Sequence, residues 1–528
     1  MSEGRFDLAI VGSAFGGSLL AMIARRLGRS VVLIERGSHP RFAIGESSTP
    51  LANLLLEELA VRYRLPRLLP LTQWGAWQRA YPEIGCGLKR GFSFYHQESG
   101  RPWCAREDRA NELLVAASPS DEVADTHWYR PDFDHWFQRE AVALGAEYHD
   151  GTELRSFSEE SDGVRLDGVR AGLPVTFRAR WVVDASGPRS FLSRALGLGE
   201  SPWTDYPATQ ALYSHFEGVR RWADLHPSHG TPPYPPDDAA LHHVFDGGWM
   251  WVLRFNNGLT SAGVSVNAAL AKELRLSEGA SAWQRLMDRF PSVAAQFEGA
   301  RPVREFTQIP MMPFRSAVMA GDRWALLPSA AGFVDPLLST GFPLTLLGIE
   351  RLARLLESDG VPDPDALSSY ATQTRIDLDA AAALIGALHR NLGRPEIFQP
   401  LSLLYFAAAI FAETSRRLGR PALAGGFLLR GRPDFARGVD EVLRLAAVTT
   451  SDVSAVHEAV HRTLEPVNLA GLGRAERRNW YPVQVEDLFE SAEKVGATRS
   501  ELEAMLWKCG ISPQLGMPVG VDRTVAGG

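Results

Sequence analysis

Residues 6–37 read FDLAIVGSAFGGSLLAMIARRLGRSVVLIERG, which predicts an apolar strand, a glycine-rich turn, a helix and a second buried strand. This order is the βαβ fingerprint of dinucleotide-binding folds. Gly12 permits the tight turn, Gly17 lets the helix pack closely on the strands, and Glu35 ends the second strand where a carboxylate accepts hydrogen bonds from a ribose diol. The N–H groups at the helix N-terminus face the position of a pyrophosphate. The segment therefore predicts a Rossmann-type domain that binds a dinucleotide.

The turn departs from the fingerprint at one position. Ala14 occupies the place of the middle glycine, where the backbone approaches the phosphate, and its methyl group is a small intrusion. We therefore keep the assignment. The residues of this region that we expect to contact the cofactor are Gly12, Ala14, Phe15, Gly16, Gly17, Glu35 and Arg36.

The composition of the 528-residue chain is that of an ordinary globular protein, with 45% hydrophobic residues and a formal net charge of −7. This length suggests two or three subdomains. The negative charge and the lack of a long basic run argue against nucleic acid or a membrane surface as a partner. Cys86, Cys104 and Cys509 are too scattered for a disulfide framework or a metal cluster, so we expect no metal site. No signal-peptide pattern is visible, and a cytoplasmic location is expected.

Further strand and helix patterns follow the fingerprint. A polar loop at 41–50 leads into a helix from Leu51 to Arg62, and Asp132 is the expected N-cap of a helix that ends near Gly145. Alternating segments from 210 to 267 predict an antiparallel sheet. From about Pro364 the pattern is helical nearly to the end.

The predicted fold is α/β, with a Rossmann-type FAD-binding domain interleaved with an antiparallel-sheet substrate domain and followed by a C-terminal helical extension. This interleaving favours a two-domain flavoprotein over a simple dehydrogenase. The expected boundaries are 1–75, 130–200 and 305–363 for the discontinuous FAD-binding domain, 76–129 and 201–304 for the substrate domain, and 364–528 for the mainly helical region.

Four blocks of sequence resemble the flavin-dependent halogenases within the flavin monooxygenase superfamily, most closely the pyrrole-chlorinating members. The likeness covers about the first three quarters of the chain. The blocks are GESS at 45–48, DASG at 184–187, GFVDPLLSTG at 332–341 and GLKRGFSF at 87–94. In that family the first three lie beside the flavin, and the fourth holds a lysine that receives hypohalous acid.

The resemblance implies a role for each block. The residues that it adds to the flavin contacts are Glu46, Ser47, Ser48, Asp184, Gly187, Asp335 and Gly341. It implies that Ser339, Thr340 and Gly341 hold halide at a helix N-terminus. It further implies that Lys89 presents hypohalous acid to the substrate, which makes Lys89 the expected catalytic residue. Outside this family context, Lys89 would be interpreted as an ordinary solvated lysine beside Arg90.

The segment GGWMWVLR at 247–254 resembles the halogenase signature Trp-x-Trp-x-Ile-Pro, with Arg254 in place of the proline. In that family the tryptophans are thought to screen the flavin from the substrate, although alternating tryptophans on a strand are also typical of a core. Arg254 either recognises an acidic substrate or forms a surface salt bridge. Leu338 replaces the glutamate of tryptophan-halogenating members, which argues against tryptophan as substrate. The expected substrate contacts are Phe94, Trp249, Trp251 and Arg254.

These observations predict a halogenase that uses FADH2, O2 and a halide ion to modify an electron-rich aromatic small molecule, either a pyrrole or a phenol. FADH2 would come from a separate reductase, because no second fingerprint for a nicotinamide nucleotide is visible. Whether the substrate is free or linked to a carrier protein stays open. One alternative is an FAD-dependent monooxygenase or other oxidoreductase of the same fold without halide, which Arg254 favours. Another is a flavin-binding protein without turnover, because Ser329 replaces an acid that contacts the ribityl chain in the family.

Overall fold

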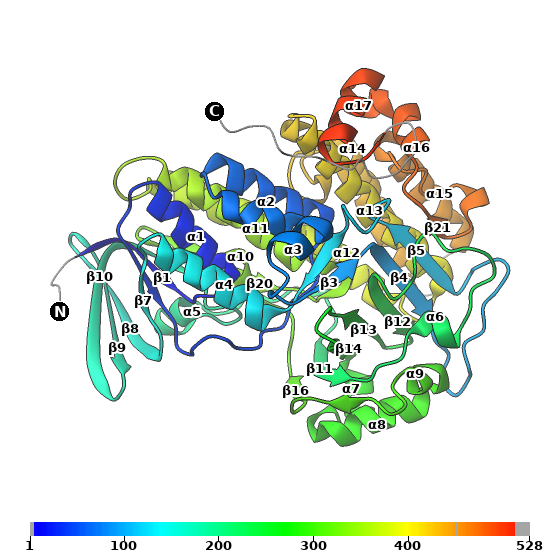
Figure 1. The fold of residues 1–528 in the computed structure, drawn as a ribbon, viewed down its shortest axis with the longest axis horizontal. Coiled ribbons are helices and arrows are strands. Elements are labelled where there is room, and N and C mark those ends of the chain that lie inside the picture. Colours follow the sequence, from blue (N-terminus) through cyan, green and yellow to red (C-terminus); the bar gives the residue numbers. More distant parts are fainter. Residues whose placement is uncertain (1–4, 449–451, 513–528) are drawn as a thin grey trace.

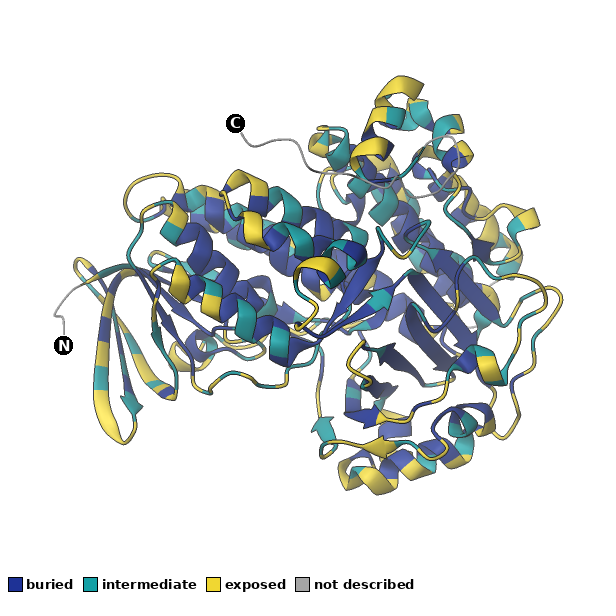
Figure 2. Ribbon diagram, viewed as in Figure 1, coloured by how far each residue is buried: buried dark blue, intermediate teal, exposed yellow. Residues whose placement is uncertain are grey.

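The structure is a computed structural model that describes residues 5–448 and 452–512. One lobe contains the fingerprint, a second lobe contains residues 209–267, and the C-terminal helices stack on the second lobe (Figure 1). Buried residues fill the central strands and helices of both lobes, whereas exposed residues lie mainly on the outer helices, the loops and the protruding strands between residues 152 and 180 (Figure 2).

The first sheet is mainly parallel and contains the fingerprint. Its strands are β1 (Phe6–Val11), β2 (Val31–Ile34), β7 (Glu147–His149), β8 (Thr152–Glu160), β9 (Gly163–Arg170), β10 (Leu173–Asp184), β18 (Ala320–Gly321) and β19 (Trp324–Leu326). β1 lies between β2 and β10 and pairs in parallel with both. All of β2 is buried, as expected for a parallel strand covered on both faces. The predicted βαβ unit is confirmed, because α1 (Phe15–Arg26) connects β1 to β2.

The second sheet is mixed. Its strands are β4 (Gly91–His96), β5 (Glu112–Ala116), β11 (Thr209–Glu217), β12 (Ala240–Phe245), β13 (Gly248–Arg254), β14 (Thr260–Asn267), β15 (Arg301–Pro302), β16 (Thr307–Ile309) and β21 (Trp480–Tyr481). The antiparallel sheet predicted for 210–267 is confirmed by the pairing of β11 with β14, β14 with β13 and β13 with β12. β12 then pairs in parallel with β4, and β21 pairs in parallel with β5.

Two short ladders complete the strands. β3 (Cys86–Lys89) pairs with β6 (Asp125–Trp128), and β17 (Phe314–Arg315) pairs with β20 (Gly332–Phe333). The antiparallel register of β3 and β6 sets Lys89 directly opposite Asp125. Directly opposite residues project from the same face, so these two side chains are neighbours.

Long helices cover the first sheet and fill the junction between the lobes. They are α2 (Pro50–Arg62), α4 (Arg130–Ala143), α11 (Gly341–Leu356), α12 (Pro364–Arg390) and α13 (Pro395–Arg417). The other helices are α3 (Trp74–Ala80), α5 (Phe191–Ala195), α6 (Trp222–Leu225), α7 (Ala268–Leu274), α8 (Ala280–Arg289), α9 (Pro291–Gln296), α10 (Pro328–Ala331), α14 (Pro433–Ala446), α15 (Val453–Leu464), α16 (Val485–Glu490) and α17 (Arg499–Lys508). The predicted helical C-terminal region is therefore confirmed over the described residues, apart from the short strand β21.

One predicted boundary was wrong. α4 begins at Arg130 with Tyr129 as its N-cap, so Asp132 lies in the first turn. Its Oδ2 accepts a hydrogen bond from the backbone N–H of Gly85 at 3.0 Å and does not cap the helix. Pro131 near the helix start is favourable there, because its missing N–H would have had no partner inside the helix.

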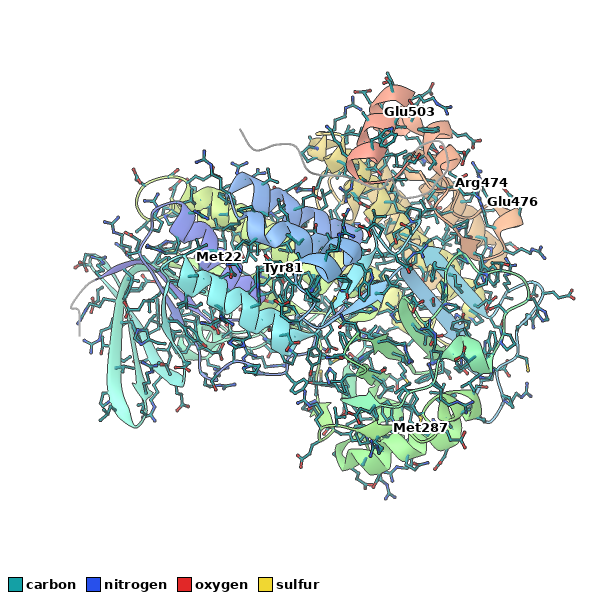
Figure 3. All side chains as sticks on the ribbon, in the orientation of Figure 1. Met22, Tyr81, Met287, Arg474, Glu476 and Glu503 are labelled. Atoms are coloured by element: carbon teal, nitrogen blue, oxygen red, sulfur yellow. The ribbon has the colours of Figure 1, made fainter. Side chains whose placement is uncertain are left out.

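Helix α13 has the length and hydropathy of a membrane-spanning helix, but 78% of its apolar window is buried in the protein. It packs through Phe398 and Phe406 on the aromatic side chains of β4. It is thus a core helix of this fold. Figure 3 marks Met22 in the packed interior of the first lobe and Arg474, Glu476 and Glu503 in the C-terminal helical region.

The predicted domain boundaries remain predictions. The second sheet takes β16 from residues expected in the FAD-binding domain and β21 from the expected helical region. Its strands therefore come from three separate parts of the chain.

Candidate functional site

The glycine turn has the geometry that the fingerprint requires. Gly12 adopts a φ of +100°, and a Cβ at this position would lie 2.6 Å from the carbonyl oxygen of Ala185. A Cβ on Gly17 would overlap the carbonyl oxygen of Gly12. Both positions therefore demand glycine, one for its backbone conformation and both for close packing.

Glu35 lies at the end of β2 and organises this turn. Its carboxylate accepts hydrogen bonds from the backbone N–H of Ser13 at 3.0 Å and of Gly37 at 2.9 Å, and Arg41 donates to it at 3.2 Å. Burial alone would raise the pKa of Glu35, but Arg41 and these hydrogen bonds outweigh it and lower the pKa. Glu35 is thus a buried acceptor that stays ionised. Arg36 beside it is exposed.

A cavity of about 300 Å³ opens beside the turn, and we call it the fingerprint pocket. The predicted residues that line it are Ala14, Phe15, Gly16, Glu46, Ser47, Gly187, Trp249, Trp251, Asp335, Ser339, Thr340 and Gly341. The predicted residues that do not line it are Gly12, Gly17, Glu35, Arg36, Ser48, Asp184, Lys89, Phe94 and Arg254. The structure therefore brings three of the four sequence blocks and the two signature tryptophans around one cavity.

Two predicted aspartates order the pocket wall through hydrogen bonds to neighbouring residues. Asp184 accepts hydrogen bonds from Ser186 and from the N–H of Leu192, which orders the turn before α5. Asp335 accepts hydrogen bonds from Trp249 at 3.1 Å and from Ser265 at 2.7 Å. Both carboxylates are thus engaged by the protein, and Asp335 fixes the ring of Trp249 against the pocket.

The predicted halide segment forms the start of α11. Leu338 and Ser339 both have positive φ values, 64° and 55°, so the chain bends at these two residues. The helix begins directly after this bend, at Gly341. Ser339, Thr340 and Gly341 all line the fingerprint pocket. The first N–H groups of a helix have no partner inside it and carry partial positive charge, which suits a small anion.

Two side chains in this region were missed from the sequence. His215 on β11 forms a buried contact with Glu46 at 2.7 Å. Arg130 at the start of α4 donates to the carbonyl oxygen of Gly45 at 2.7 Å and pairs with buried Asp134 at 2.8 Å. Both hold the polar loop at 41–50 against the pocket. Neither contact could have been predicted from a local pattern, because the His215 contact spans 169 residues of sequence and the Arg130 contact spans 85.

Lys89 is completely buried on β3. Its Nζ donates hydrogen bonds to Ser47 Oγ at 2.8 Å, to the carbonyl oxygen of Ser48 and to Ser339 Oγ at 3.4 Å. The same Nζ lies 3.9 Å from the centre of the Phe92 ring. Burial, partly offset by the charge of Asp125, lowers the pKa of Lys89 to about 7. The surface-lysine interpretation of Lys89 is therefore wrong.

The chain contains four lysines, and the other three, Lys272, Lys494 and Lys508, are exposed or half-buried. Arginine is the usual basic residue of this chain, but an arginine cannot lose its proton in a protein. A buried lysine can exist as amine or ammonium near neutral pH, which is a chemical property that no arginine could supply here.

A second cavity of about 200 Å³, which we call the aromatic pocket, lies on the other side of Lys89. Phe92, Tyr405 and Phe406 form aromatic walls, with the rings of Phe92 and Phe406 in an edge-to-face contact at 5.2 Å. Asn53 of α2 and Asp125 of β6 supply buried polar groups. Since Ser47 and Ser339 line the fingerprint pocket and Phe92 lines the aromatic pocket, the Lys89 amine contacts the walls of both.

Two predicted substrate residues lie elsewhere. Phe94 is fully buried and stacks on His242 at 4.5 Å, and it lines neither pocket. Arg254 also lines neither pocket, and its guanidinium donates to the carbonyl oxygens of Val219 at 3.1 Å and Arg220 at 3.3 Å. A packing role for Phe94 and a structural role for Arg254 fit this geometry better than contact with a substrate.

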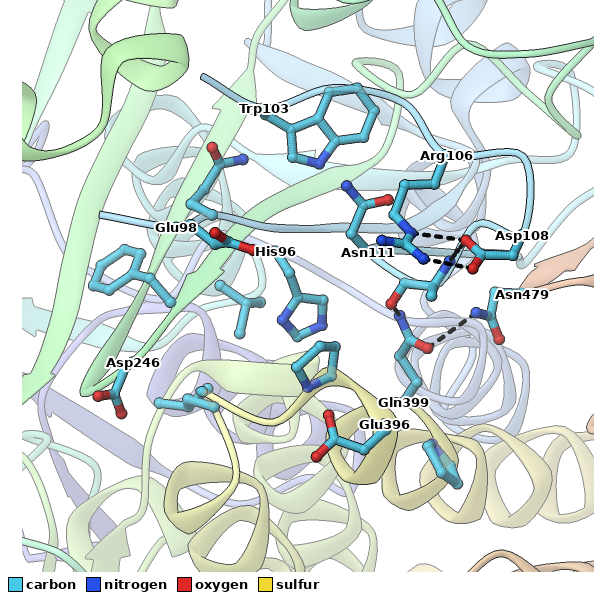
Figure 4. Close-up of a pocket in the computed structure, with 18 of the residues that line it drawn as sticks. His96, Glu98, Trp103, Arg106, Asp108, Asn111, Asp246, Glu396, Gln399 and Asn479 are labelled. Atoms are coloured by element: carbon cyan, nitrogen blue, oxygen red, sulfur yellow. Dashed lines mark hydrogen bonds and ion pairs between the residues drawn. The ribbon is translucent and has the colours of Figure 1, made fainter. Parts of the chain in front are cut away.

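A third and larger cleft lies beyond the end of β4. Figure 4 shows His96 and Gln399 facing it, with Arg106 paired to Asp108 and Gln399 bonded to Asn479 at its rim. None of the predicted site residues lines this cleft. Tyr481 lines both this cleft and the aromatic pocket, so it forms part of the wall between them.

Comparison with solved structures identifies the class of fold. The crystal structure of halogenase PltM in complex with phloroglucinol and FAD superposes with a TM-score of 0.80 at 24% sequence identity, and the match covers 90% of this chain and 99% of that one. The arrangement of two lobes and a helical region is therefore that of a flavin-dependent halogenase fold.

The particular family follows from the sequence comparisons. The model of the tryptophan halogenase family matches residues 125–396, more than half of the chain, so the chain belongs to this family. Monodechloroaminopyrrolnitrin halogenase PrnC from Pseudomonas fluorescens is 32% identical over 66% of this chain and 61% of that protein. Tetracycline 7-halogenase from Kitasatospora aureofaciens is 32% identical over 69% of this chain and 66% of that protein. The chain thus spans less than two thirds of the length of these two relatives.

Proposed function

We propose that this protein halogenates an electron-rich aromatic small molecule, a pyrrole or a phenol, with hypohalous acid that Lys89 positions against the ring. One observation carries the proposal, namely that the fully buried Lys89 amine contacts the walls of both the fingerprint pocket and the aromatic pocket. A path for an oxidised halogen between a cofactor site and a substrate site requires a group in this position.

The residues of the fingerprint pocket fit FAD. Within the described part of the chain, Arg41 Nε and Glu46 Oε2 are buried without a hydrogen-bond partner, and both residues line the pocket. A bound phosphate and a flavin donor would satisfy such atoms. The glycine turn would hold the pyrophosphate, Glu35 the ribose, and Ser329 the ribityl chain in place of the missing acid. When bound, reduced FAD supplies the reaction with O2 that oxidises halide to hypohalous acid.

The other residues of the site would hold the reactants and exclude water. Ser339, Thr340 and Gly341 would hold halide at the N-terminus of α11. Trp249 and Trp251, which are almost fully buried, would separate the flavin from the substrate. Phe94 and Arg254 have no direct part in this scheme, because neither lines a pocket.

Lys89 would then hold hypohalous acid at the mouth of the aromatic pocket. A lysine with a pKa of about 7 can accept a hydrogen bond as an amine or donate one as an ammonium. As the halogen bonds to a ring carbon, the oxygen–halogen bond breaks, and the displaced ring proton leaves with the hydroxide as water. The chain thus contributes position, a titratable donor and exclusion of water.

The proposed partners are a small aromatic substrate, free or linked to a carrier protein, and a separate reductase that supplies FADH2. No nucleic acid and no stable membrane association is expected, and the proposed location is the cytoplasm. The alternative oxidoreductase without halide loses its main support, since Arg254 bonds to backbone carbonyls outside both pockets.

The test supplies the purified protein with FAD, a flavin reductase, O2 and either chloride, bromide or no halide, and follows phenols and pyrroles by mass spectrometry. Lys89→Met should abolish halogenated product while reduced flavin still consumes O2. Lys272→Met, at an exposed lysine on α7, is the matched control and should leave product formation intact. Product at more than a few per cent of the wild-type rate in Lys89→Met would refute the role of Lys89, and hydroxylated product without halide dependence would support the alternative.

A further inference from the structure

Two buried hydrogen-bond acceptors in the aromatic pocket have no partner among the residues that the structure describes. They are Asp125 Oδ2 and Asn53 Oδ1. Asp125 is 6% exposed and Asn53 is 3% exposed, and both residues line the aromatic pocket. A buried acceptor without a donor is unfavourable, so two of them side by side call for an explanation.

The two side chains already form a fixed pair. Asn53 Nδ2 donates to Asp125 Oδ1 at 2.8 Å, which orients both amide and carboxylate. The amide nitrogen points at Asp125, so the other carboxylate oxygen and the amide oxygen are the atoms left free. Neither Lys89 nor Arg417 forms an ion pair within 4.0 Å of Asp125 among the described residues. A group that pairs with both the ionised carboxylate and the amide oxygen would therefore be a hydrogen-bond donor.

The walls of the pocket indicate which kind of ligand carries this donor. Phe92, Tyr405 and Phe406 present aromatic faces, and the volume of about 200 Å³ lies below the ~300–1,000 Å³ of sites for drug-sized ligands. The pocket thus suits one small aromatic ring. Because Lys89 and Asp125 face one another across β3 and β6, a ring whose donor reached Asp125 would lie next to the Lys89 amine.

We propose that Asp125 and Asn53 form the recognition site for the substrate and select aromatic rings that carry an O–H or N–H donor. This inference rests on the proposed function and extends it by naming the residues that choose the substrate. The hydrogen bond from the ring donor to the Asp125 carboxylate fixes which ring carbon faces Lys89. It also draws electron density from the donor bond into the ring, which favours attack by an electrophile. Rings whose donor is capped by a methyl group leave both acceptors unpaired and are rejected.

The test compares donor-bearing rings with their methylated analogues. Dissociation constants are measured by calorimetry for resorcinol against 1,3-dimethoxybenzene and for pyrrole against N-methylpyrrole, with FAD present. Wild-type protein should prefer the donor-bearing member of at least one pair by roughly 10- to 100-fold, the range of one charge-assisted hydrogen bond. The pair that shows the preference identifies O–H or N–H as the donor.

The variant Asp125→Asn keeps the size of the side chain and an acceptor for Asn53, but it replaces the free carboxylate oxygen with an NH2 group. The preference of this variant for the donor-bearing ring should fall at least tenfold. Its affinity should shift toward the methoxy ring, because the methoxy oxygen can accept a hydrogen bond from the new NH2 group. Glu350→Gln is the matched control, since Glu350 lines neither pocket and its carboxylate is paired with Arg416 at 2.9 Å. Glu350→Gln should keep the wild-type preference.

Equal affinities for the capped and uncapped rings in wild-type protein would overturn the inference, as would equal losses in Asp125→Asn and Glu350→Gln. Melting temperature and FAD affinity of each variant are measured in parallel, and Asn53→Leu is the second variant if Asp125→Asn does not fold. Because binding is measured without turnover, a protein that shows the preference but makes no halogenated product would refute the proposed function and leave the recognition site standing.

Discussion

The buried pair of Lys89 and Asp125 should make the protein less stable than it could be. Burial lowers the pKa of Lys89 from 10.5 to about 7 and raises the pKa of Asp125 from 3.8 to about 7. Lys89 lies beyond ion-pair distance of Asp125, so neither charge fully offsets the burial of the other, and replacing even true buried ion pairs by residues that cannot ionise is neutral or stabilises proteins by about 1–4 kcal/mol. We expect Lys89→Met with Asp125→Asn to raise the free energy of unfolding by about 1–4 kcal/mol at pH 7.

The increase in the free energy of unfolding of the double variant should depend on pH. The folded pKa of Asp125 is raised, so its contribution to stability is complete below pH 3.8 and is lost as the pH rises through about 7. The folded pKa of Lys89 is lowered, so its contribution is complete above pH 10.5 and is lost as the pH falls through about 7. The wild-type pair therefore destabilises the folded protein most near pH 7. The increase in the free energy of unfolding of the double variant should be largest there and smaller at pH 5 and pH 9.

Urea unfolding followed by tryptophan fluorescence at pH 5, 7 and 9 measures this difference. Taking the double variant minus wild type cancels the titration of all other groups, and Lys272→Met should show no difference. Each single variant should be less stable than the double variant, because it leaves one buried ionisable group without its partner. A double variant that is less stable than wild type at pH 7, or a difference that does not vary with pH, would refute the reasoning.

Two further predictions concern the turn and the strand β13. Gly12→Val should abolish FAD binding in a flavin fluorescence titration, because the new side chain would collide with the carbonyl group of Ala185. The control is Gly28→Asn, at a glycine that also has a positive φ but has no atom within 4 Å of its Cβ position, and this variant should bind FAD normally. Unaltered affinity in Gly12→Val would contradict the dinucleotide assignment. Arg254→Met should lower the free energy of unfolding by about 1–3 kcal/mol, through loss of its bonds to Val219 and Arg220, and leave kcat/KM for the aromatic substrate unchanged. A tenfold fall in kcat/KM at unchanged stability would instead restore Arg254 as a substrate contact.

The parts of the fold that could be predicted are those that local patterns encode. The strand, turn and helix of the fingerprint lie within 32 consecutive residues, and each glycine has a steric reason that can be read from its position. The strands β11–β14 were also predicted from local patterns, although the structure buries both faces of β12 and β13. The start of α4 was misplaced because Tyr129, which caps it, is a weak signal compared with Asp132.

The site itself depends on contacts that no local pattern encodes. Family resemblance singled out Lys89, but its burial follows from the pairing of β3 with β6 and from loop residues Ser47 and Ser48. Asp125 was missed because its segment shows little periodicity, and its position opposite Lys89 needs the register of that pairing. The partners of Arg254 could not be predicted, since its carbonyl acceptors lie 34 and 35 residues away in sequence.

The pairing of β21 with β5 has a consequence for how the protein is made. Leu114 and Val115 of β5 receive their neighbours Trp480 and Tyr481 only after some 360 more residues have been synthesised. At about 5–20 residues per second, that delay lasts roughly 20–70 s. During this time the nascent chain presents an apolar strand edge, which is prone to pair with other chains. β1 and β2 of the first lobe pair without this delay. A ribosome-bound chain should therefore fold its first lobe before β21 covers the edge of the second sheet. Dependence on chaperones should be greatest in the time between these two events.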